Sequence, residues 1–379
     1  MATTLIDGRV LEGGGQLLRN AVALAALLAR PISIDKIRQN RGSPGLKHQH
    51  ATGLRLVADI CSADLSGCTV GSDAISFRPG PIQLFRHYTA DTKTAGSIAL
   101  LLQIALPCLL FSHTPSSGPT ELTLRGGTNA LQAPQLDYTM RVFLPFLQRH
   151  FGLQPQLRVR TRGFYPKGGG EVYLSVPPVR GPLPPVELIE RGSLSTVAGR
   201  AYVAGLPERV AEAMRDAAVQ TLVSSGVDPG VIDISSVREK RSESVGSGSG
   251  IVLWAETSGG CVLGGSAVGQ KRRDPATVGR EAAEELVRNL EHGGCVDEHM
   301  QDQMIIFLAL ARGRSTVRTG PLTLHTRTAI WIAEHLTEAK FEIEEPRGVI
   351  IRCDGIGYTS DDFQQPSNHP PPSPSSAIP

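Results

Sequence analysis

The chain of 379 residues is long enough to bury a sizeable core and to form two or three domains. Hydrophobic residues make up 40% and charged residues 20%, a balance that excludes collagen-like, coiled-coil and largely disordered proteins. Lysine and arginine number 38 against 36 for aspartate and glutamate, so the net charge is only +2. An anionic ligand must therefore be bound by a local cluster of cations.

Strands alternate with helices along the first half of the chain. Turn signals and hydrophobic periodicity predict strands at 4–10, 32–37, 122–124, 157–162 and 172–176, and helices at 17–29, 43–63, 94–111 and 133–151. Ser43 and Pro44 are a typical N-cap and first-turn pair for the second helix. Glycine clusters recur beside these strands, which indicates repeated strand–helix units in α/β or α+β layers.

A break in composition follows at 177–185 (PPVRGPLPP), where we expect a linker. Helices predicted at 209–224 and 274–291, and strands near 198–203, 231–234, 251–255 and 261–263, indicate an inserted α+β domain. Within it, 242–250 (SESVGSGSG) is expected to be a mobile loop. The chain then returns to the first body through helices at 298–311 and 325–337 and strands at 316–318, 341–344 and 349–353.

The six cysteines are scattered without a CxxC pair, so a zinc site and a disulfide framework are not expected. The N-terminus lacks the basic start and apolar core of a signal peptide. The longest apolar stretch, 98–111, contains Gln103 and Pro107 and is too short to span a bilayer. We therefore expect an intracellular protein with no membrane partner.

Glu12 precedes three glycines, and Arg19 lies two turns into the helix that follows them, where it could reach an anion. A glycine-rich turn between a strand and a helix lets backbone N–H groups approach a phosphate, and an acid at its mouth can hold Mg²⁺. The glycines are explained equally well by a tight turn that needs positive φ angles. The absence of a GxxxxGK[ST] motif excludes a P-loop, and no GxGxxG supports a dinucleotide site.

A second candidate is a basic cluster without an intervening acid, made of Lys36, Arg38, Arg41, Lys47, His48 and His50, with Gln49 among them. Such a cluster is either a solvated loop or a site for a polyanion, and we favour anion binding. The segment 162–171 (RGFYPKGGGE) suits phosphate contact and base stacking, or it is a plain hairpin.

His325 falls at the expected start of a helix, whose positive end disfavours an imidazolium and favours a neutral, nucleophilic ring. A single histidine is more often structural, so its position alone does not select it. Asp302 and Gln303 lie just before an apolar helical run and either contact a nucleotide or metal or cap the helix.

Together these segments resemble the RNA 3′-terminal phosphate cyclase family, in particular its animal-type catalytic branch. The resemblance extends over nearly the whole chain except the linker and the tail. It is carried by EGGGQLLR at 12–19, IRQNRGSPGL at 37–46 with QH at 49–50, ADTKTAGS at 90–97, GGTNA at 126–130 with APQ at 133–135, RGFYPKGGGEV at 162–172, QDQ at 301–303 and TGPLTLHT at 319–326.

The resemblance implies a fold of repeated βαβαββ units with a smaller inserted α+β domain. On this basis the main domain comprises 1–184 and 284–358, the inserted domain 185–283, and a disordered Pro/Ser-rich tail 359–379. It also implies RNA with a 3′-terminal phosphate as the partner, no obligate protein partner, and an intracellular location in the nucleus, in the nucleoplasm.

The implied reaction uses ATP and a divalent metal, Mg²⁺ or Mn²⁺. A histidine takes AMP from ATP and releases pyrophosphate, the RNA 3′-phosphate then takes the AMP, and the neighbouring 2′-OH displaces it to close a 2′,3′-cyclic phosphate. By position, His325 matches the nucleophile and Glu12 the metal ligand. Positions that contact nucleotide are Gln103, Pro134, His299, Asp302 and Gln303, and those that surround the phosphates are Arg19, Arg38, Arg41, Gln49 and His50.

One residue departs from the family pattern, because His299 stands where relatives usually have a tyrosine. Two other classes of function are weighed beside the enzyme. Some cyclase-like relatives are non-catalytic RNA-binding factors in ribosome biogenesis, and they lack the nucleophile that LTLHT carries here. An enolpyruvyl-type transferase shares the repeated fold, but no motif of this chain supports it.

Overall fold

The structure is a computed structural model, which describes residues 2–82, 84, 87–111, 118–345 and 348–360. Residues 361–379 of the expected tail lie outside the described residues. No helix of the described residues is long and apolar enough to cross a membrane. All six cysteines are buried and free.

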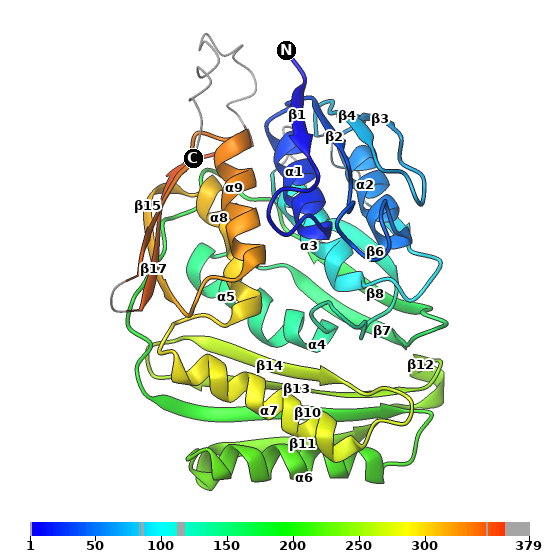
Figure 1. Ribbon diagram of the computed structural model, residues 1–379, viewed down its shortest axis with the longest axis vertical. Coiled ribbons are helices and arrows are strands. Elements are labelled where there is room, and N and C mark those ends of the chain that lie inside the picture. The colour runs from blue at the N-terminus through cyan, green and yellow to red at the C-terminus, as the bar shows by residue number, and fades with distance from the viewer. Residues whose placement is uncertain (1, 83, 85–86, 112–117, 346–347, 361–379) are drawn as a thin grey trace.

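The first of three similar units begins at the N-terminus (Figure 1). Its sheet has the order β1-β2-β4-β3, in which β1 and β2 are parallel and the other pairs are antiparallel. The unit therefore has the connectivity βαβαββ. Its elements are β1 (Thr4–Asp7), α1 (Gly15–Leu27), β2 (Ile32–Asp35), α2 (His48–Ile60), β3 (Asp64–Ser66) and β4 (Ile75–Arg78).

The second unit repeats this topology in the strand order β5-β6-β8-β7, with one further strand, β12, paired to β7. The single helix expected at 133–151 is divided by a π-helical turn at Thr139–Phe143. The elements are β5 (His87–Asp91), α3 (Ile98–Leu110), β6 (Thr120–Gly126), α4 (Leu136–Tyr138), α5 (Leu144–Phe151), β7 (Gln156–Gly163) and β8 (Gly170–Val176).

The third unit is interrupted after its first strand. Its strand order, β9-β15-β17-β16, again has one parallel pair followed by two antiparallel pairs. Three units with one topology confirm the predicted fold class. The elements are β9 (Glu187–Leu188), α8 (Glu298–Leu310), β15 (Arg312–Thr319), α9 (Leu324–Leu336), β16 (Lys340–Glu344) and β17 (Val349–Ile356).

The inserted segment between β9 and α8 forms its own four-stranded sheet, ordered β11-β10-β13-β14, and lies as a separate layer at the bottom of Figure 1. Helix α7 continues past residue 283, where we expect the main domain to resume, and the predicted domain limits stay predictions. The elements are β10 (Leu194–Ala204), α6 (Arg209–Ser224), β11 (Ile232–Arg238), β13 (Gly248–Thr257), β14 (Val262–Val268) and α7 (Pro275–Glu291).

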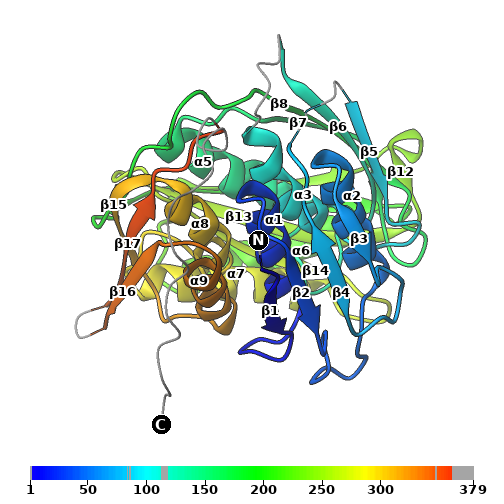
Figure 2. The same ribbon diagram turned by 90° about the horizontal axis from the view of Figure 1, so that it is seen from above.

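The helices of the three units pack together in the middle, and the three sheets surround them, as Figure 2 shows from above. Helix α1 buries eleven of its thirteen residues and α3 buries twelve of thirteen. A helix enclosed by other helices and a sheet needs apolar residues around most of its circumference. This position explains why neither sequence shows a narrow apolar stripe.

Two local predictions are wrong. Helix α2 begins at His48, not at Ser43, because the backbone N–H of Lys47 donates to His50 Nδ1 at 3.1 Å and caps the helix there. The segment 242–250 is not a mobile loop. It forms β12 (Ser244–Val245), which pairs with β7, and the beginning of β13.

Candidate functional site

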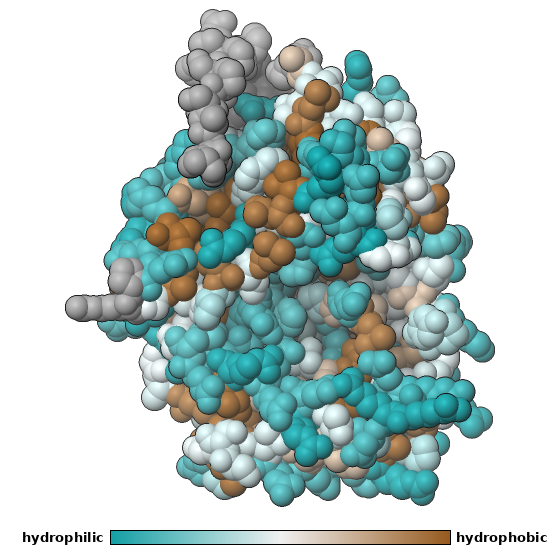
Figure 3. All heavy atoms as spheres, in the orientation of Figure 1, coloured by the Kyte–Doolittle hydropathy of each residue, from teal (hydrophilic) through white to brown (hydrophobic). Residues whose placement is uncertain are grey.

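A cavity of about 1230 Å³ lies where the three units meet the inserted layer. In Figure 3 hydrophilic residues predominate on this face of the molecule. Gln303 does not line the cavity: its side chain is buried, and its Nε2 donates to the carbonyl of His299 at 2.7 Å. The eleven other residues of the predicted site line this one cavity: Glu12, Arg19, Arg38, Arg41, Gln49, His50, Gln103, Pro134, His299, Asp302 and His325.

Glu12 is held inward by the glycine-rich turn between β1 and α1. Its side chain is only 7% exposed, and its carboxylate pairs with Arg41, whose Nη2 also donates to the Glu12 carbonyl at 2.9 Å. The second carboxylate oxygen, Oε2, is buried without a hydrogen-bond partner among the described residues. A Cβ at Gly14 would collide with this carboxylate, so a larger residue there would displace the Glu12 side chain. A buried oxygen of this kind fits a divalent cation.

Three cationic or imidazole side chains line the wall built by α1, α2 and the loop after β2. Burial lowers the pKa of the Arg19 guanidinium, and burial together with the charge of Arg41 lowers that of Arg38. Burial, Arg19, Arg38 and Lys47 lower the pKa of His50 to about 3, so His50 is neutral at physiological pH. The Nε atoms of Arg19 and Arg38 are buried without partners among the described residues. Guanidinium N–H groups that are buried without partners favour an anionic ligand.

Gly15 leaves the space in which two of these groups meet. A Cβ there would lie 2.8 Å from His50 Nε2 and 2.9 Å from Arg19 Nη1. We expect Gly15→Ala to displace both groups and to weaken the binding of tripolyphosphate by about tenfold, measured by calorimetry. Gly42→Ala is the matched control, because an added Cβ at Gly42 meets nothing within 4 Å. If Gly15→Ala and wild type bound tripolyphosphate with equal affinity, the proposed role of Gly15 in leaving space for His50 and Arg19 would be refuted.

Gln49 and Gln103 differ in what they contact. Gln49 Oε1 accepts a hydrogen bond from the backbone N–H of Ser97 at 2.9 Å, and Ser97 is the N-cap of α3. Gln49 therefore fixes the start of the helix on which Gln103 lies. Gln103 of α3 and Pro134 of the loop that precedes α4 line the side of the cavity that belongs to the second unit.

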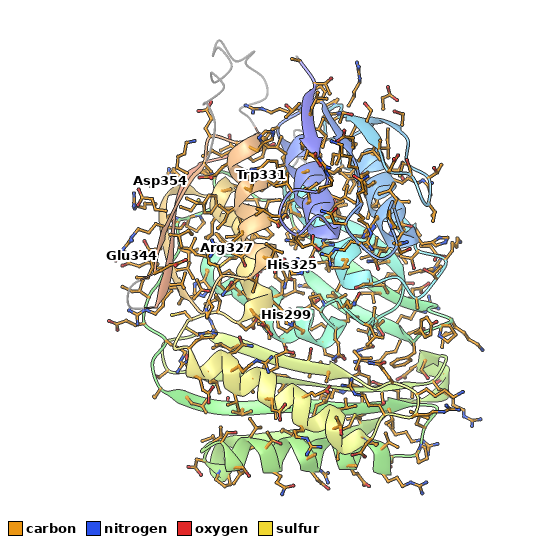
Figure 4. The ribbon with its side chains drawn as sticks, in the orientation of Figure 1. His299, His325, Arg327, Trp331, Glu344 and Asp354 are labelled. Atoms are coloured by element: carbon orange, nitrogen blue, oxygen red, sulfur yellow. The ribbon has the colours of Figure 1, made fainter. Side chains whose placement is uncertain are left out.

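His325 is the second residue of α9, and Figure 4 shows it at the end of this helix that faces the inserted layer. The helix is capped by Thr323, whose hydroxyl accepts from the backbone N–H of Thr326 at 3.1 Å. The imidazole is 53% exposed, and its Nδ1 lies 4.0 Å from Glu12 Oε1. An accessible imidazole at a helix N-terminus, beside a carboxylate and buried cations, is suited to attack a phosphoryl group.

Asp302 lies on the neighbouring helix α8. Burial raises its pKa to about 6, against the opposing charges of His325, Arg19 and His299. Asp302 therefore changes its charge close to neutral pH. A carboxyl group in this state can hold or release a proton during a reaction at pH 6 to 7.

The sequence did not reveal that the inserted layer contributes a wall of the cavity. Its lining residues come from the end of β14, the loop after it and α7. The spacing of the α7 residues indicates one polar helical face, but nothing local shows what that face meets. The residues of the inserted layer that line the cavity are Ser266, Ala267, Val268, Arg273, Glu281, Glu284, Glu285 and Arg288.

The segment 162–171 is the hairpin between β7 and β8, and its first residue does not face a ligand. Arg162 is buried and bound to Asp137, at 2.5 Å and 2.8 Å, and to Glu239 at 2.7 Å. Of the two interpretations of this segment, the plain hairpin agrees better with Arg162, because all three of its guanidinium nitrogens already contact carboxylates. Tyr165 at the tip is 79% exposed.

Comparisons with known proteins identify the family. The family model described as RNA 3′-terminal phosphate cyclase matches residues 10–343. The RNA 3′-terminal phosphate cyclase of Drosophila melanogaster is 43% identical over 358 residues, which cover 94% of this chain and 97% of the relative. A probable RNA 3′-terminal phosphate cyclase of Dictyostelium discoideum is 41% identical over 94% of this chain and 84% of the relative. A Methanopyrus kandleri relative of the same name is 40% identical over 94% of this chain and its own full length.

The chain belongs to the RNA 3′-terminal phosphate cyclase family and is an enzyme of that type. The motifs identified in the sequence therefore led to the correct family. The family match covers the inserted segment and most of the three units.

Proposed function

We propose that this enzyme converts an RNA 3′-terminal phosphate into a 2′,3′-cyclic phosphate at the expense of ATP, with His325 as the nucleophile. The observation that carries the proposal is the content of one cavity: an accessible imidazole at a helix start, an unpartnered buried carboxylate oxygen, and buried guanidinium groups. A triphosphate needs all three, since its charge must be neutralised before an imidazole attacks phosphorus.

In the proposed first step, a ring nitrogen of His325 bonds to the α-phosphorus of ATP, and the bond to the bridging oxygen breaks, which releases pyrophosphate. The RNA 3′-phosphate then displaces the histidine and takes the AMP. In the last step the adjacent 2′-oxygen attacks the 3′-phosphorus, its proton is lost, and AMP leaves with the bridging electron pair. Asp302 is suited to take a proton in this sequence, since its pKa is about 6.

Arg19, Arg38 and Arg41 would bind the phosphates, and Gln103, Pro134 and His299 would surround the nucleobase. Glu12 is the residue that would hold Mg²⁺ or Mn²⁺, because its Oε2 is buried and has no partner among the described residues. The metal, when bound, would lower the charge on the phosphoryl oxygens. Arg41, which pairs with Glu12, would then be released to contact phosphate.

A non-catalytic RNA-binding role in ribosome biogenesis is the alternative. The accessibility of His325 within the cavity favours the enzyme, because a binding factor needs no nucleophile there. We also propose that the protein acts in the nucleus on RNA ends and needs no obligate protein partner. Tagged protein seen only outside the nucleus would refute this location.

The test uses ATP labelled at the α-phosphate, Mg²⁺ and RNA with a 3′-phosphate. We expect the wild-type protein to acquire a covalent, acid-labile label without RNA, and to lose it as RNA with a cyclic end and AMP accumulate. A folded protein that binds ATP but neither becomes labelled nor changes the RNA end would refute the catalytic proposal and favour the binding factor.

A further inference from the structure

Helix α7 of the inserted layer places a carboxylate against the cavity wall. Glu285 Oε1 lies 3.2 Å from His299 Nε2 and also accepts a hydrogen bond from the backbone N–H of Ser266 at 3.2 Å. The Glu285 side chain is 16% exposed, whereas the His299 ring is 38% exposed and lines the cavity. Figure 4 shows His299 at the end of α8 that faces α7. One edge of the imidazole is therefore fixed by the inserted layer.

The second unit fixes the same ring from another side. The ring of Tyr138 meets His299 edge to face, with centroids 5.7 Å apart and planes at 83°. The Tyr138 hydroxyl donates to Asp297 Oδ1 at 2.7 Å, and Asp297 caps α8 by accepting from the backbone N–H groups of His299 and Met300. Three parts of the fold therefore fix the position of the imidazole: the inserted layer through Glu285, the second unit through Tyr138, and helix α8 through its cap at Asp297.

Acidic groups outnumber cations around His299. Burial by itself lowers the pKa of the imidazole, but the hydrogen bond to Glu285 and the charges of Glu285, Asp297 and Glu298 outweigh it and raise the pKa to about 9. Asp302 follows one turn later on α8, and Arg288 of α7 lies 3.6 Å from Glu298. His299 is therefore an imidazolium at neutral pH, and Tyr138 is a neutral phenol there because burial raises its pKa.

We propose that Glu285 is a positioning residue for the nucleotide: it keeps His299 doubly protonated in the cavity wall and thereby makes the inserted layer part of the nucleobase site. This inference rests on the proposed use of ATP. With Nε2–H on Glu285, the cation presents Nδ1–H as a second donor. The neutral ring would present a lone pair at Nδ1 instead, which repels the acceptor nitrogens of adenine.

A histidine at position 299 gives this site a charge that the phenol of a tyrosine would not have. A tyrosine hydroxyl donates at any pH below its own ionisation, so its contact with a base does not titrate near neutrality. The contact made by His299 does titrate, and Glu285 sets the pH at which it does so. Nucleotide affinity should therefore decrease as pH rises through about 9.

The test measures the pKa of His299 by NMR and the affinity for ATP by calorimetry, in wild type and in Glu285→Gln. We expect the wild-type ring to titrate near 9 and the variant near the ordinary value of about 6.5. At pH 8 about 90% of wild-type rings and about 3% of variant rings then carry both protons, so ATP binding should weaken by roughly 30-fold. At pH 6 the loss should be less than about twofold.

Two further variants sharpen the comparison. Glu284→Gln removes the same charge from the adjacent, exposed position of α7 and should leave the His299 titration near 9. His299→Tyr should remove the pH dependence and make ATP affinity insensitive to Glu285→Gln. Equal ATP affinity of wild type and Glu285→Gln at pH 8 would overturn the inference.

The NMR titration separates this inference from the proposed function. If wild type binds no ATP, the proposed function fails, while a shifted His299 resonance still reports the ion pair. The ligand atoms of Glu285, Glu298 and His299 lie within 4.8 Å of one another, so a metal is the competing occupant. A His299 resonance that responds to Zn²⁺ but not to pH between 6 and 10 would overturn the ion pair in favour of a metal site.

Discussion

His325→Asn is expected to abolish covalent labelling by ATP and to lower turnover of 3′-phosphorylated RNA by roughly 10⁴-fold or more. Asparagine keeps a polar side chain at the second position of α9 but has no nitrogen that can accept AMP and release it. Affinity for ATP should change by less than about threefold, because the imidazole contributes to the reaction and not to the neutralisation of charge. Mass spectrometry of the ATP-treated protein and a gel assay of the RNA end measure both effects.

His335 provides the matched control on the same helix. Its ring stacks on Trp331 with centroids 4.9 Å apart and planes at 10°, and it does not line the cavity. His335→Asn should therefore be labelled as wild type is. An adduct that persists in His325→Asn, or one that maps to a lysine in wild type, would contradict the role of His325.

The core helices of the three units could be predicted from the sequence because their information is local. Leu17 to Leu27 and Ile98 to Leu110 are apolar around most of their circumference, and only an enclosed helix tolerates this. The strands β3, β4 and β5 were missed, since each has five residues or fewer and buries at most two of them. Such short patterns do not differ from those of loops.

The candidate site was predicted through the resemblance rather than through periodicity. The residues from Glu12 to His50 are close in sequence, but their meeting with His325 depends on the packing of α1 against α9, which no local pattern encodes. The sequence did not predict that Glu285 contacts His299, because this contact also depends on how distant helices pack together. The burial of Arg162 was not evident from the sequence, because its partners lie in distant segments, in α4 and after β11.

Arg162→Met is expected to destabilise the fold by about 3–5 kcal/mol. Arg162 of β7 binds Asp137 of the second unit and Glu239 of the inserted segment, and all three side chains are at most 9% exposed. Arg200 of β10 completes the cluster with contacts of 3.4 Å to Asp137 and 2.9 Å to Glu239. Methionine fills a similar volume but leaves two buried carboxylates with one cation. Thermal and urea unfolding measure the decrease in the free energy of unfolding.

Arg158→Met on the same strand is the control, because Arg158 is exposed on β7 and its loss should change stability by less than about 0.5 kcal/mol. If Arg162→Met lowered the free energy of unfolding by no more than this control does, the cluster would not stabilise the junction between the second unit and the inserted layer.

The same cluster fixes how stability should depend on pH. Burial by itself raises the pKa of Asp137, but the hydrogen bonds and charges of Arg162 and Arg200 outweigh it and lower that pKa below the ordinary 3.8. A carboxyl group with a lowered pKa stabilises the fold fully above its unfolded pKa, and this contribution is lost as pH falls through the folded pKa. In Arg162→Met burial dominates, so the pKa of Asp137 should rise. The difference between the unfolding free energies of wild type and Arg162→Met should therefore narrow as pH falls from 7 to 4.

An Asp137→Asn change added to Arg162→Met removes one of the two buried negative charges. It should restore part of the stability at pH 7, because the single guanidinium of Arg200 then faces only Glu239.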